Sequence, residues 1–196
     1  MIIEQNFFEI KDGRKAVVRN PREEDIPAIL EYLTRSSGET DFLIRYPEEI
    51  NYTYESEKEL LERVNASESQ TMLVCLVEGM IAGMCNITFE TSLKTRHRAT
   101  VAIALLKEYW NLGIGTHMIE MLISIAKTNP DILQVELDFI EGNVRARALY
   151  EKMGFRIAGI HPDAVKLKNG TLLNEYLLIK KLDRLPGRSH HTGLNQ

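Results

Sequence analysis

The sequence predicts a mixed α/β domain, in which helices cover both faces of a single mixed central sheet of about seven strands. Two observations support this fold class. Hairpin-forming segments dominate the first part of the chain, and strand-like and helix-like segments alternate in the second part. The 196 residues suffice for one sizeable core, and 44% hydrophobic with 27% charged residues is typical of a soluble globular protein.

The first part of the chain is expected to contain paired strands and two helices. The expected strands are 4–10, 14–20, 70–79 and 80–90. Apolar residues at helical spacing predict helices over 21–36 and 56–67, and Ser56 with Glu59 is interpreted as the capping box of the second helix. A polar and aromatic connection over 37–55 separates these helices, and connections of this length tend to be functional.

The second part is expected to alternate strands with helices. The segment 98–106 is apolar along nearly its whole length, which favours a central place in the sheet. Further strands are expected at 132–140, 155–161 and 171–182, and helices at 114–128 and 143–153. Gly154 favours the end of the last helix. Residues 1–183 are therefore predicted to form one domain, and 184–196 a polar C-terminal tail.

The composition disfavours several classes of partner. A formal net charge of −4 argues against nucleic acid, because phosphate binding needs a concentrated basic surface. We find no apolar run of about eighteen residues that would predict a membrane span. The first residues also lack the basic start and cleavage site of a signal peptide. We therefore expect a cytoplasmic protein with neither nucleic acid nor membrane as a partner.

The cysteines and histidines do not predict a metal centre. Cys75 and Cys85 fit neither a disulfide framework nor a metal motif. A reducing compartment favours free thiols, and a bond between the two predicted strands that carry them is the alternative. His190 and His191 stand in the tail without further ligands at suitable spacing. No metal is expected.

Residues 107–122, KEYWNLGIGTHMIEML, predict a tight turn between a strand and a helix. The first N–H groups of a helix have no acceptors inside the helix, and together with the helix dipole they bind anions. Gly113 and Gly115 would let an oxygen-rich ligand approach the backbone. We therefore expect a phosphate or diphosphate against residues 111–116. A glycine-rich turn that only packs well is the structural alternative.

The turn does not match two common phosphate-binding loops. Counted from Gly113, the pattern GxxxxGK[ST] requires a second glycine where the chain has Met118. The same methionine replaces the third glycine of GxGxxG. An NTPase or a nicotinamide-dependent dehydrogenase is therefore disfavoured.

A second motif lies downstream of the turn. The segment NVRARALYEKMGF follows the pattern N-x-x-A-x-x-x-Y-x-x-x-G-F. Its matching residues are Asn143, Ala146, Tyr150, Gly154 and Phe155. Together with the turn LLKEYWNLGIGT, this motif resembles the GCN5-related N-acetyltransferase (GNAT) superfamily over roughly residues 14–182. The resemblance implies a GNAT-like fold and acetyl-CoA as co-substrate.

The resemblance also implies where acetyl-CoA would bind. Family members hold it where two neighbouring parallel strands splay apart, here 101–106 and 134–140. The backbone of Leu105 and Lys107 would pair with the pantetheine arm, and residues 111–116 would hold the diphosphate. The implied cofactor-binding residues are Leu105, Leu106, Lys107, Asn111, Leu112, Gly113, Ile114, Gly115, Thr116, Asn143 and Lys152.

The charges of the last helix have two readings. Arg145, Arg147 and Lys152 could meet the 3′-phosphate of CoA, and a solvated helix face is the commoner fate of such residues. Asn143 is implied to contact the pantetheine, and it is also a good N-cap for this helix.

Catalytic roles follow from the same resemblance. Tyr150 is implied to act as the general acid at the thioester sulfur, with a core tyrosine as the alternative. Glu136 and Asp138 share one face of a strand, where they are candidate bases, an acidic wall for an amine, or solvent-facing charges.

Two positions depart from the family pattern. Trp110 stands where Arg or Gln is usual, so a side-chain contact with phosphate is lost there, whereas the backbone contacts of residues 111–116 do not depend on it. Thr100 stands where many relatives carry a glutamate base. The nearest other carboxylates are those of Glu136, Asp138 and Glu141.

These inferences predict an acyltransferase. It would move an acetyl group from acetyl-CoA to a primary amine by direct attack in a ternary complex. The acceptor would be a small-molecule amine or a protein N-terminus, bound by residues 37–55 and the last hairpin, and the protein would be a monomer or homodimer. A non-catalytic sensor of CoA or acetyl-CoA is the alternative, since Thr100 and Trp110 depart from the pattern. An interaction module without cofactor is the third hypothesis.

Overall fold

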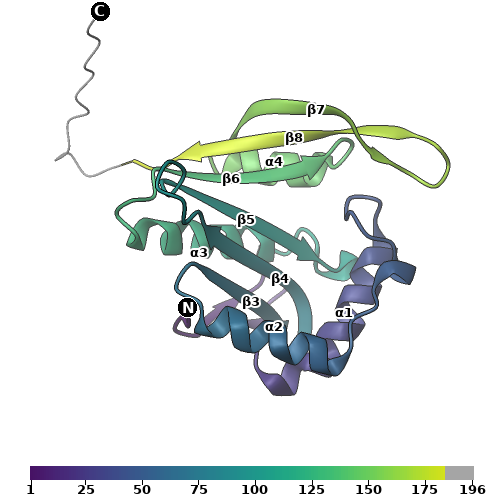
Figure 1. Ribbon diagram of the computed structural model, residues 1–196. Coiled ribbons are helices and arrows are strands. Elements are labelled where there is room, and N and C mark those ends of the chain that lie inside the picture. Colours follow the sequence, from purple (N-terminus) through teal and green to yellow (C-terminus); the bar gives the residue numbers. More distant parts are fainter. Residues whose placement is uncertain (184–196) are drawn as a thin grey trace, which may run out of the picture.

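The computed structural model describes residues 1–183 and shows one mixed sheet with helices on both faces (Figure 1). The strands are β1 (Asn6–Glu9), β2 (Lys15–Arg19), β3 (Gln70–Val77), β4 (Met80–Phe89), β5 (Arg98–Leu105), β6 (Gln134–Ile140), β7 (Arg156–Lys166) and β8 (Leu172–Lys181). The helices are α1 (Ile26–Glu39), α2 (Tyr54–Ala66), α3 (Ile114–Thr128) and α4 (Val144–Lys152), with short 3₁₀ turns η1 (Glu23–Asp25), η2 (Pro47–Glu49) and η3 (Lys107–Tyr109). The predicted tail over 184–196, including His190 and His191, lies outside the described residues.

The predicted fold class is confirmed, with a small difference in strand number. The sheet has eight strands in the order β1-β2-β3-β4-β5-β6-β8-β7, rather than about seven. Each segment expected to be a strand joins this one sheet. Neighbouring strands run antiparallel except β5 and β6, which are parallel. The segment predicted to be central, β5, therefore lies inside the sheet at its one parallel junction.

The core forms where the helices cover the sheet. Helices α1 and α2 contact β4 and β3, whereas α3 contacts β4 and β5 from the other face (Figure 1). Met118, Ile119 and Leu122 form the fully buried stripe of α3. On the α1 side, the hydroxyl of Tyr32 donates a hydrogen bond of 2.8 Å to the carbonyl of Ala104 in β5. The strand β5 is therefore fixed from both faces.

Two helices begin at other residues than predicted. Helix α1 begins at Ile26 after a 3₁₀ turn, and Pro27 fits its first turn, where no backbone N–H is needed. Helix α2 is capped by Thr53, whose side chain accepts from the N–H of Ser56, while the Ser56 hydroxyl accepts from the N–H of Thr53. The predicted capping box of Ser56 and Glu59 was therefore wrong, because Ser56 is the last residue of a box that Thr53 opens.

The cysteines are buried free thiols in β3 and β4. Burial raises the pKa of the Cys75 thiol to about 12, so it stays protonated at neutral pH. Within residues 1–183, no group of three or more His, Cys, Asp or Glu side chains could hold a metal ion. In the same part of the chain, no helix is long and apolar enough to cross a membrane.

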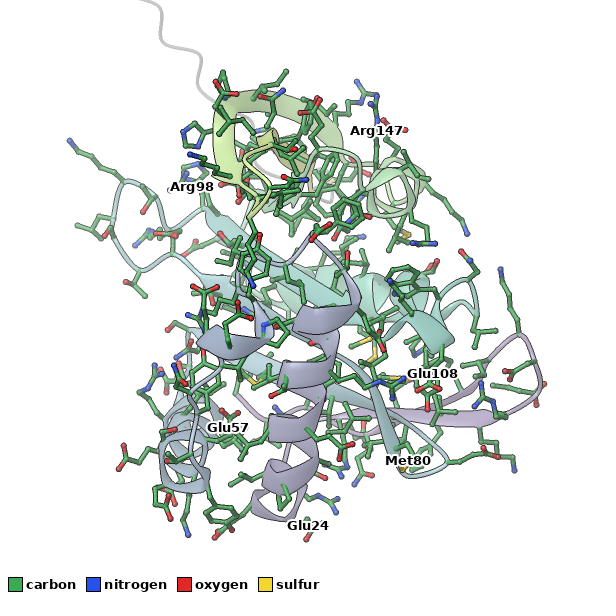
Figure 2. All side chains as sticks on the ribbon, turned by 90° about the vertical axis from the view of Figure 1, so that its right-hand side faces the viewer. Glu24, Glu57, Met80, Arg98, Glu108 and Arg147 are labelled. Atoms are coloured by element: carbon green, nitrogen blue, oxygen red, sulfur yellow. The ribbon has the colours of Figure 1, made fainter. Side chains whose placement is uncertain are left out.

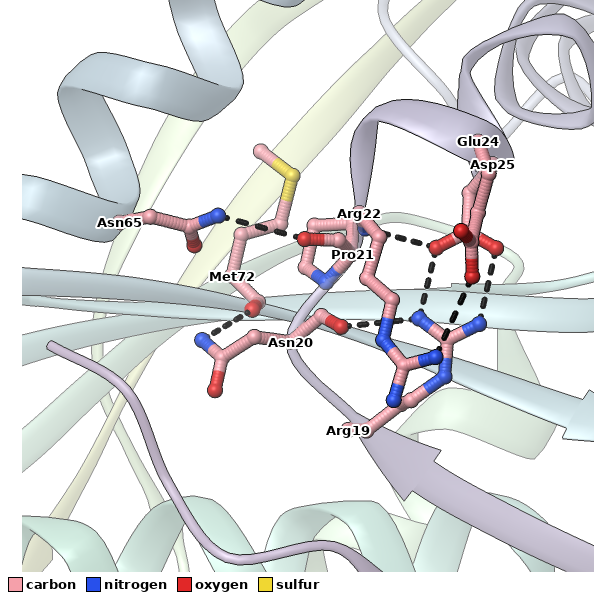
Figure 3. A network of polar contacts seen from close by, with 8 residues as sticks. All are labelled: Arg19, Asn20, Pro21, Arg22, Glu24, Asp25, Asn65 and Met72. Atoms are coloured by element: carbon pink, nitrogen blue, oxygen red, sulfur yellow. Dashed lines mark hydrogen bonds and ion pairs between the residues drawn. The ribbon is translucent and has the colours of Figure 1, made fainter.

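A buried ion pair fixes the start of α1 against β2. Arg19 donates to both carboxylate oxygens of Asp25, at 2.6 and 2.8 Å, and the N–H of Arg22 donates to the same carboxylate at 2.7 Å (Figure 3). Burial opposes ionisation of Asp25, but these hydrogen bonds and the charges of Arg19 and Arg22 outweigh it, so its pKa lies below its usual value. The guanidinium also donates to the carbonyl of Asn20 at 3.0 Å.

We predict that Asp25→Asn lowers the free energy of unfolding by about 3 kcal/mol at pH 7, because it leaves the Arg19 charge buried without its partner. Urea denaturation measures this loss. The folded pKa of Asp25 is lowered, so its stabilisation is present above the unfolded pKa and is lost as the pH falls through the folded pKa. The variant and the natural protein should therefore converge in acid. The exposed Glu24, which pairs with Arg22, supplies the control: Glu24→Gln should change stability by less than about 1 kcal/mol. Equal losses in both variants would contradict the prediction.

Candidate active site

The parallel junction between β5 and β6 opens along its length. Ladder pairs join these strands only from Arg98–Gln134 to Thr100–Glu136, although β5 continues to Leu105 and β6 to Ile140. The space between the diverging ends is called the gap below. The N–H of Leu106 donates to Ala82 in β4, so the N–H and carbonyl of Leu105 point to the opposite edge, toward the gap. The predicted splaying of the two strands is present.

The gap leads into a cavity of about 630 Å³. Its walls come from β5 and β6, from the start of α3, from α4, and from Thr40 and residues 42–44. The predicted site residues that line it are Leu105, Asn111, Gly113, Gly115, Thr116, Asp138, Asn143, Tyr150 and Lys152. The fold therefore brings together in one space residues of two separate sequence motifs and Asp138 from the strand between them.

Four predicted cofactor-binding residues do not line this cavity. The side chains of Leu106 and Ile114 are buried in the core, and Leu112 packs against it. The N–H of Lys107 donates to the carboxylate of Glu39 at 2.6 Å. A glutamate from α1 thus holds that N–H in this structure, and the backbone contact of Lys107 with a ligand stays a prediction. The other three could contact a ligand only through the backbone.

Of the three candidate bases, Asp138 lines the cavity. Glu136 is buried at the last position of β6 that pairs with β5, where its carboxylate accepts from Gln134 and lies 3.5 Å from Arg98. The carboxylate of Glu141 accepts from the N–H of Asn174 in β8 at 3.0 Å. Glu136 and Glu141 are therefore held in structural contacts, and the prediction that Glu136 serves as the base is not supported by its position.

The environment of Asp138 favours its protonated form. Asp138 is exposed on the cavity side, but partial loss of hydration raises the pKa of its carboxyl, and the negative charges of Glu175 and Glu136 raise it further. A carboxylate with a raised pKa accepts a proton more readily than an ordinary aspartate. Asp138 thus combines a position on the cavity with the electrostatics of a base.

The glycine turn, residues 111–116, has the backbone that the sequence predicted. Gly113 is the N-cap of α3 with φ of +91°, a conformation that favours glycine, and Asn111 has φ of +64°. The first intrahelical bond runs from the N–H of His117 to Gly113, so the N–H groups of residues 114–116 have no acceptor within the helix. A Cβ on Gly115 would lie 3.1 Å from Leu149 and 3.5 Å from Leu105. The turn presents free donors at the cavity.

Tyr150 is both packed and turned to the cavity. Its ring lies 6.3 Å from that of Phe139 and 6.0 Å from that of Phe155, and only 6% of the residue is exposed. Burial raises the pKa of its phenol to about 12, so the hydroxyl is protonated at neutral pH. Within residues 1–183, no protein group accepts a hydrogen bond from this hydroxyl. It is therefore available to a ligand.

Residues 32–155 match the model of the acetyltransferase (GNAT) family. The chain belongs to this family. It is therefore an acyltransferase. An N-alpha-acetyltransferase of Sulfurisphaera tokodaii is 29% identical over 160 residues, which cover 76% of this chain and 86% of the relative.

Solved structures of the family share the fold of this acetyltransferase. The GNAT-family acetyltransferase of Streptococcus pneumoniae is 29% identical, with a TM-score of 0.79 over 85% of this chain and 99% of the other. A ribosomal-protein-alanine N-acetyltransferase of Brucella melitensis is 23% identical, with a TM-score of 0.72 over 84% and 99% of the two chains. The predicted membership of the GNAT superfamily is confirmed.

Several residues at the site of the acetyltransferase were missed from the sequence. Lys11, in the turn between β1 and β2, donates its N–H to Leu112 at 3.1 Å and lines the cavity beside Gly113. Nothing in the local sequence of a hairpin turn predicts this contact. Phe42 lines the cavity from within the connection whose length marked it as functional. Arg145 also lines the cavity. The sequence had left this residue open between a contact with CoA and a solvated helix face.

Asn143 is the N-cap of α4, a role that asparagine commonly has. Its side-chain oxygen accepts from the N–H of Ala146 at 3.2 Å, which caps α4, and the residue also lines the cavity. Since the amide nitrogen is not used in this cap, capping and ligand contact are compatible at different atoms.

We predict that Asn143→Ala lowers the free energy of unfolding by about 1 kcal/mol, because the N–H of Ala146 loses its acceptor. Asn143→Asp keeps an oxygen at the same position and should remain close to the natural protein. Urea denaturation of the three proteins measures the effect. An alanine variant as stable as the natural protein would show that the cap contributes nothing.

Proposed function

We propose that this acetyltransferase moves an acetyl group from acetyl-CoA to a primary amine by direct attack in a ternary complex. One observation carries the proposal. The cavity at the gap between β5 and β6 is lined by the glycine turn, by a protonated Tyr150 and by Asp138, whose pKa is raised. An anion-binding turn, an acid and a base are the groups that acetyl transfer from a phosphate-bearing thioester needs.

The residues of the cavity fit acetyl-CoA. The Leu105 backbone faces the gap and suits the amides of a pantetheine arm. The free N–H groups at the start of α3 suit a diphosphate, and Lys11 and Lys152 add positive charge to the same cavity. Acetyl-CoA would supply the activated acetyl group when bound.

Asp138 and Tyr150 are assigned complementary proton roles. An acceptor amine is largely protonated at neutral pH, since an alkylamine has a pKa of about 10.4 and an α-amino group one of about 8. Asp138 accepts that proton, directly or through water. Tyr150 keeps its own proton at the phenol oxygen, where it is available to the departing sulfur. The N–H of Leu105, which faces the gap, is a donor for the carbonyl oxygen under attack.

The acceptor is proposed to be a small-molecule amine or a protein N-terminus. The similarity to an enzyme named N-alpha-acetyltransferase supports the second class. Phe42, Leu43 and Ile44 give one wall of the cavity an apolar surface suited to the side chain of an acceptor.

An acceptor screen tests the function. The protein is mixed with acetyl-CoA and polyamines, free amino acids or peptides with varied N-termini, and release of free thiol is followed with mass spectrometry of the products. Acetylated product on the amine is expected. Binding of CoA without turnover of any acceptor would overturn the proposal in favour of a sensor, which the threonine at position 100 keeps as the second candidate.

We predict that Tyr150→Phe lowers kcat by about 10²-fold or more, because it removes the proton donor and keeps the ring in its packing. The affinity for CoA should change little. Tyr176→Phe is the matched control, since Tyr176 stacks on Phe139 at 5.1 Å without lining the cavity. Wild-type turnover by the Tyr150 variant would make this tyrosine a packing residue.

We predict a second effect on the pH profile of kcat/KM. The acidic limb of the profile reports a base that must lose its proton, and the raised pKa of Asp138 places this limb above the range of an ordinary aspartate. Glu175→Gln removes a negative charge that disfavours ionisation of Asp138. Its pKa should therefore fall, and the limb should move to lower pH.

Asp138→Asn should abolish this limb together with most of the activity, whereas Glu136→Gln should preserve the activity. An unchanged profile in both the Asp138 and Glu175 variants would place the base elsewhere.

A further inference from the structure

A tryptophan and an arginine meet across the open end of the gap. Trp110 follows β5, in the loop that leads to α3, and Arg145 lies in the first turn of α4, after β6. The guanidinium carbon of Arg145 lies 3.6 Å from the centroid of the Trp110 ring, well within the range of a cation–π contact. Both residues line the cavity. The stack therefore joins the segment that follows β5 to the helix that follows β6, beyond the point where these two strands stop pairing.

The Trp110 ring is itself held in place. Its indole N–H donates a hydrogen bond of 2.9 Å to the carbonyl of Leu105, which faces the gap. The ring is thus fixed to the end of β5, directly before the glycine turn. A guanidinium stacked on this ring lies beside the same turn.

Arg145 has no competing partner. Within residues 1–183, no carboxylate forms an ion pair with it, and a guanidinium that stacks through its face keeps its N–H groups for other acceptors. Its neighbour on α4 differs: Arg147 pairs with Glu151 at 2.8 Å, does not line the cavity, and points outward from the helix (Figure 2). An unpaired guanidinium that lines a cavity is available to bind an anion.

We propose that Arg145, positioned by Trp110, binds the diphosphate of CoA. The family pattern has Arg or Gln at position 110, and this chain has a tryptophan there. The cation missing from that position is supplied by α4, and the tryptophan is the platform that holds it next to the turn. This inference rests on the proposed function, because it takes CoA to be the ligand of the cavity.

Calorimetric titration of the full chain with CoA tests the role of Arg145. Arg145→Gln should raise the Kd about tenfold, the usual size of a charge-assisted hydrogen bond. Arg145→Lys keeps the charge but loses the planar guanidinium that stacks and forms paired hydrogen bonds. Its Kd should therefore lie between those of the natural protein and of Arg145→Gln. Arg147→Gln is the matched control and should bind CoA as the natural protein does. A natural Kd in the Arg145→Gln variant, or equal losses in the two glutamine variants, would overturn the proposal.

The positioning role of Trp110 needs its own readouts. Trp110→Leu should weaken CoA binding in the natural background and add no further loss to Arg145→Gln, because the ring acts through the guanidinium. Trp110→Tyr keeps an aromatic face and should restore most of the affinity. Trp110 is the one tryptophan of the sequence, so its fluorescence reports on the stack. Arg145→Gln should change the emission of the free protein, and Arg147→Gln should not. Additive losses, or an emission unchanged by Arg145→Gln, would contradict the positioning role.

A second ligand identifies the phosphate. 3′-Dephospho-CoA keeps the diphosphate, so Arg145→Gln should weaken its binding by the same factor as that of CoA. A loss confined to CoA would assign Arg145 to the 3′-phosphate and overturn the diphosphate assignment. If the natural protein bound no CoA, both this inference and the proposed function would fail. If the natural protein acetylated an amine and Arg145→Gln bound CoA normally, only this inference would fail.

Discussion

The loss of pairing between β5 and β6 after Thr100 and Glu136 is the constraint on which the site depends. A parallel ladder that stops inside a sheet leaves backbone N–H and carbonyl groups that need other partners. In this protein the carbonyl of Leu105 finds one in the indole of Trp110. The N–H of Leu105 faces the gap, where the carbonyl of an amide-bearing ligand could accept a hydrogen bond from it. The sheet therefore creates binding capacity by interrupting its own hydrogen bonding.

The same divergence sets the positions of the reacting groups. Helix α3 follows β5 and helix α4 follows β6, so separating the strand ends separates the helix starts and turns both toward one cavity. Along β6, Glu136 and Asp138 share a face, yet they lie on either side of the point where pairing ends. Glu136 is consequently buried among structural partners, and Asp138 lines the cavity with a raised pKa.

The walls of the cavity are held by contacts between distant parts of the chain. The ion pair of Arg19 and Asp25 fixes the start of α1, and the bond from Tyr32 to Ala104 ties this helix to β5. Beyond α1, Tyr46 accepts from the N–H of Lys168, in the turn between β7 and β8, and the Lys168 side chain pairs with Glu48. The connection that lines the cavity is thereby anchored to the last hairpin, so changes in either segment would alter the same acceptor wall.

The sequence by itself determined the order of the elements, the tight glycine turn before α3, and the motif from Asn143 to Tyr150. Each of these depends on local spacing or on the conformational range of one residue type. The tertiary structure decided which members of those motifs reach the cavity. It placed Ile114 in the core, gave the N–H of Lys107 to a helix far away in the chain, and set Arg145 on Trp110. Spacing along the chain fixes which residues share a face of an element. Which face meets the gap depends on packing between elements that no local pattern records.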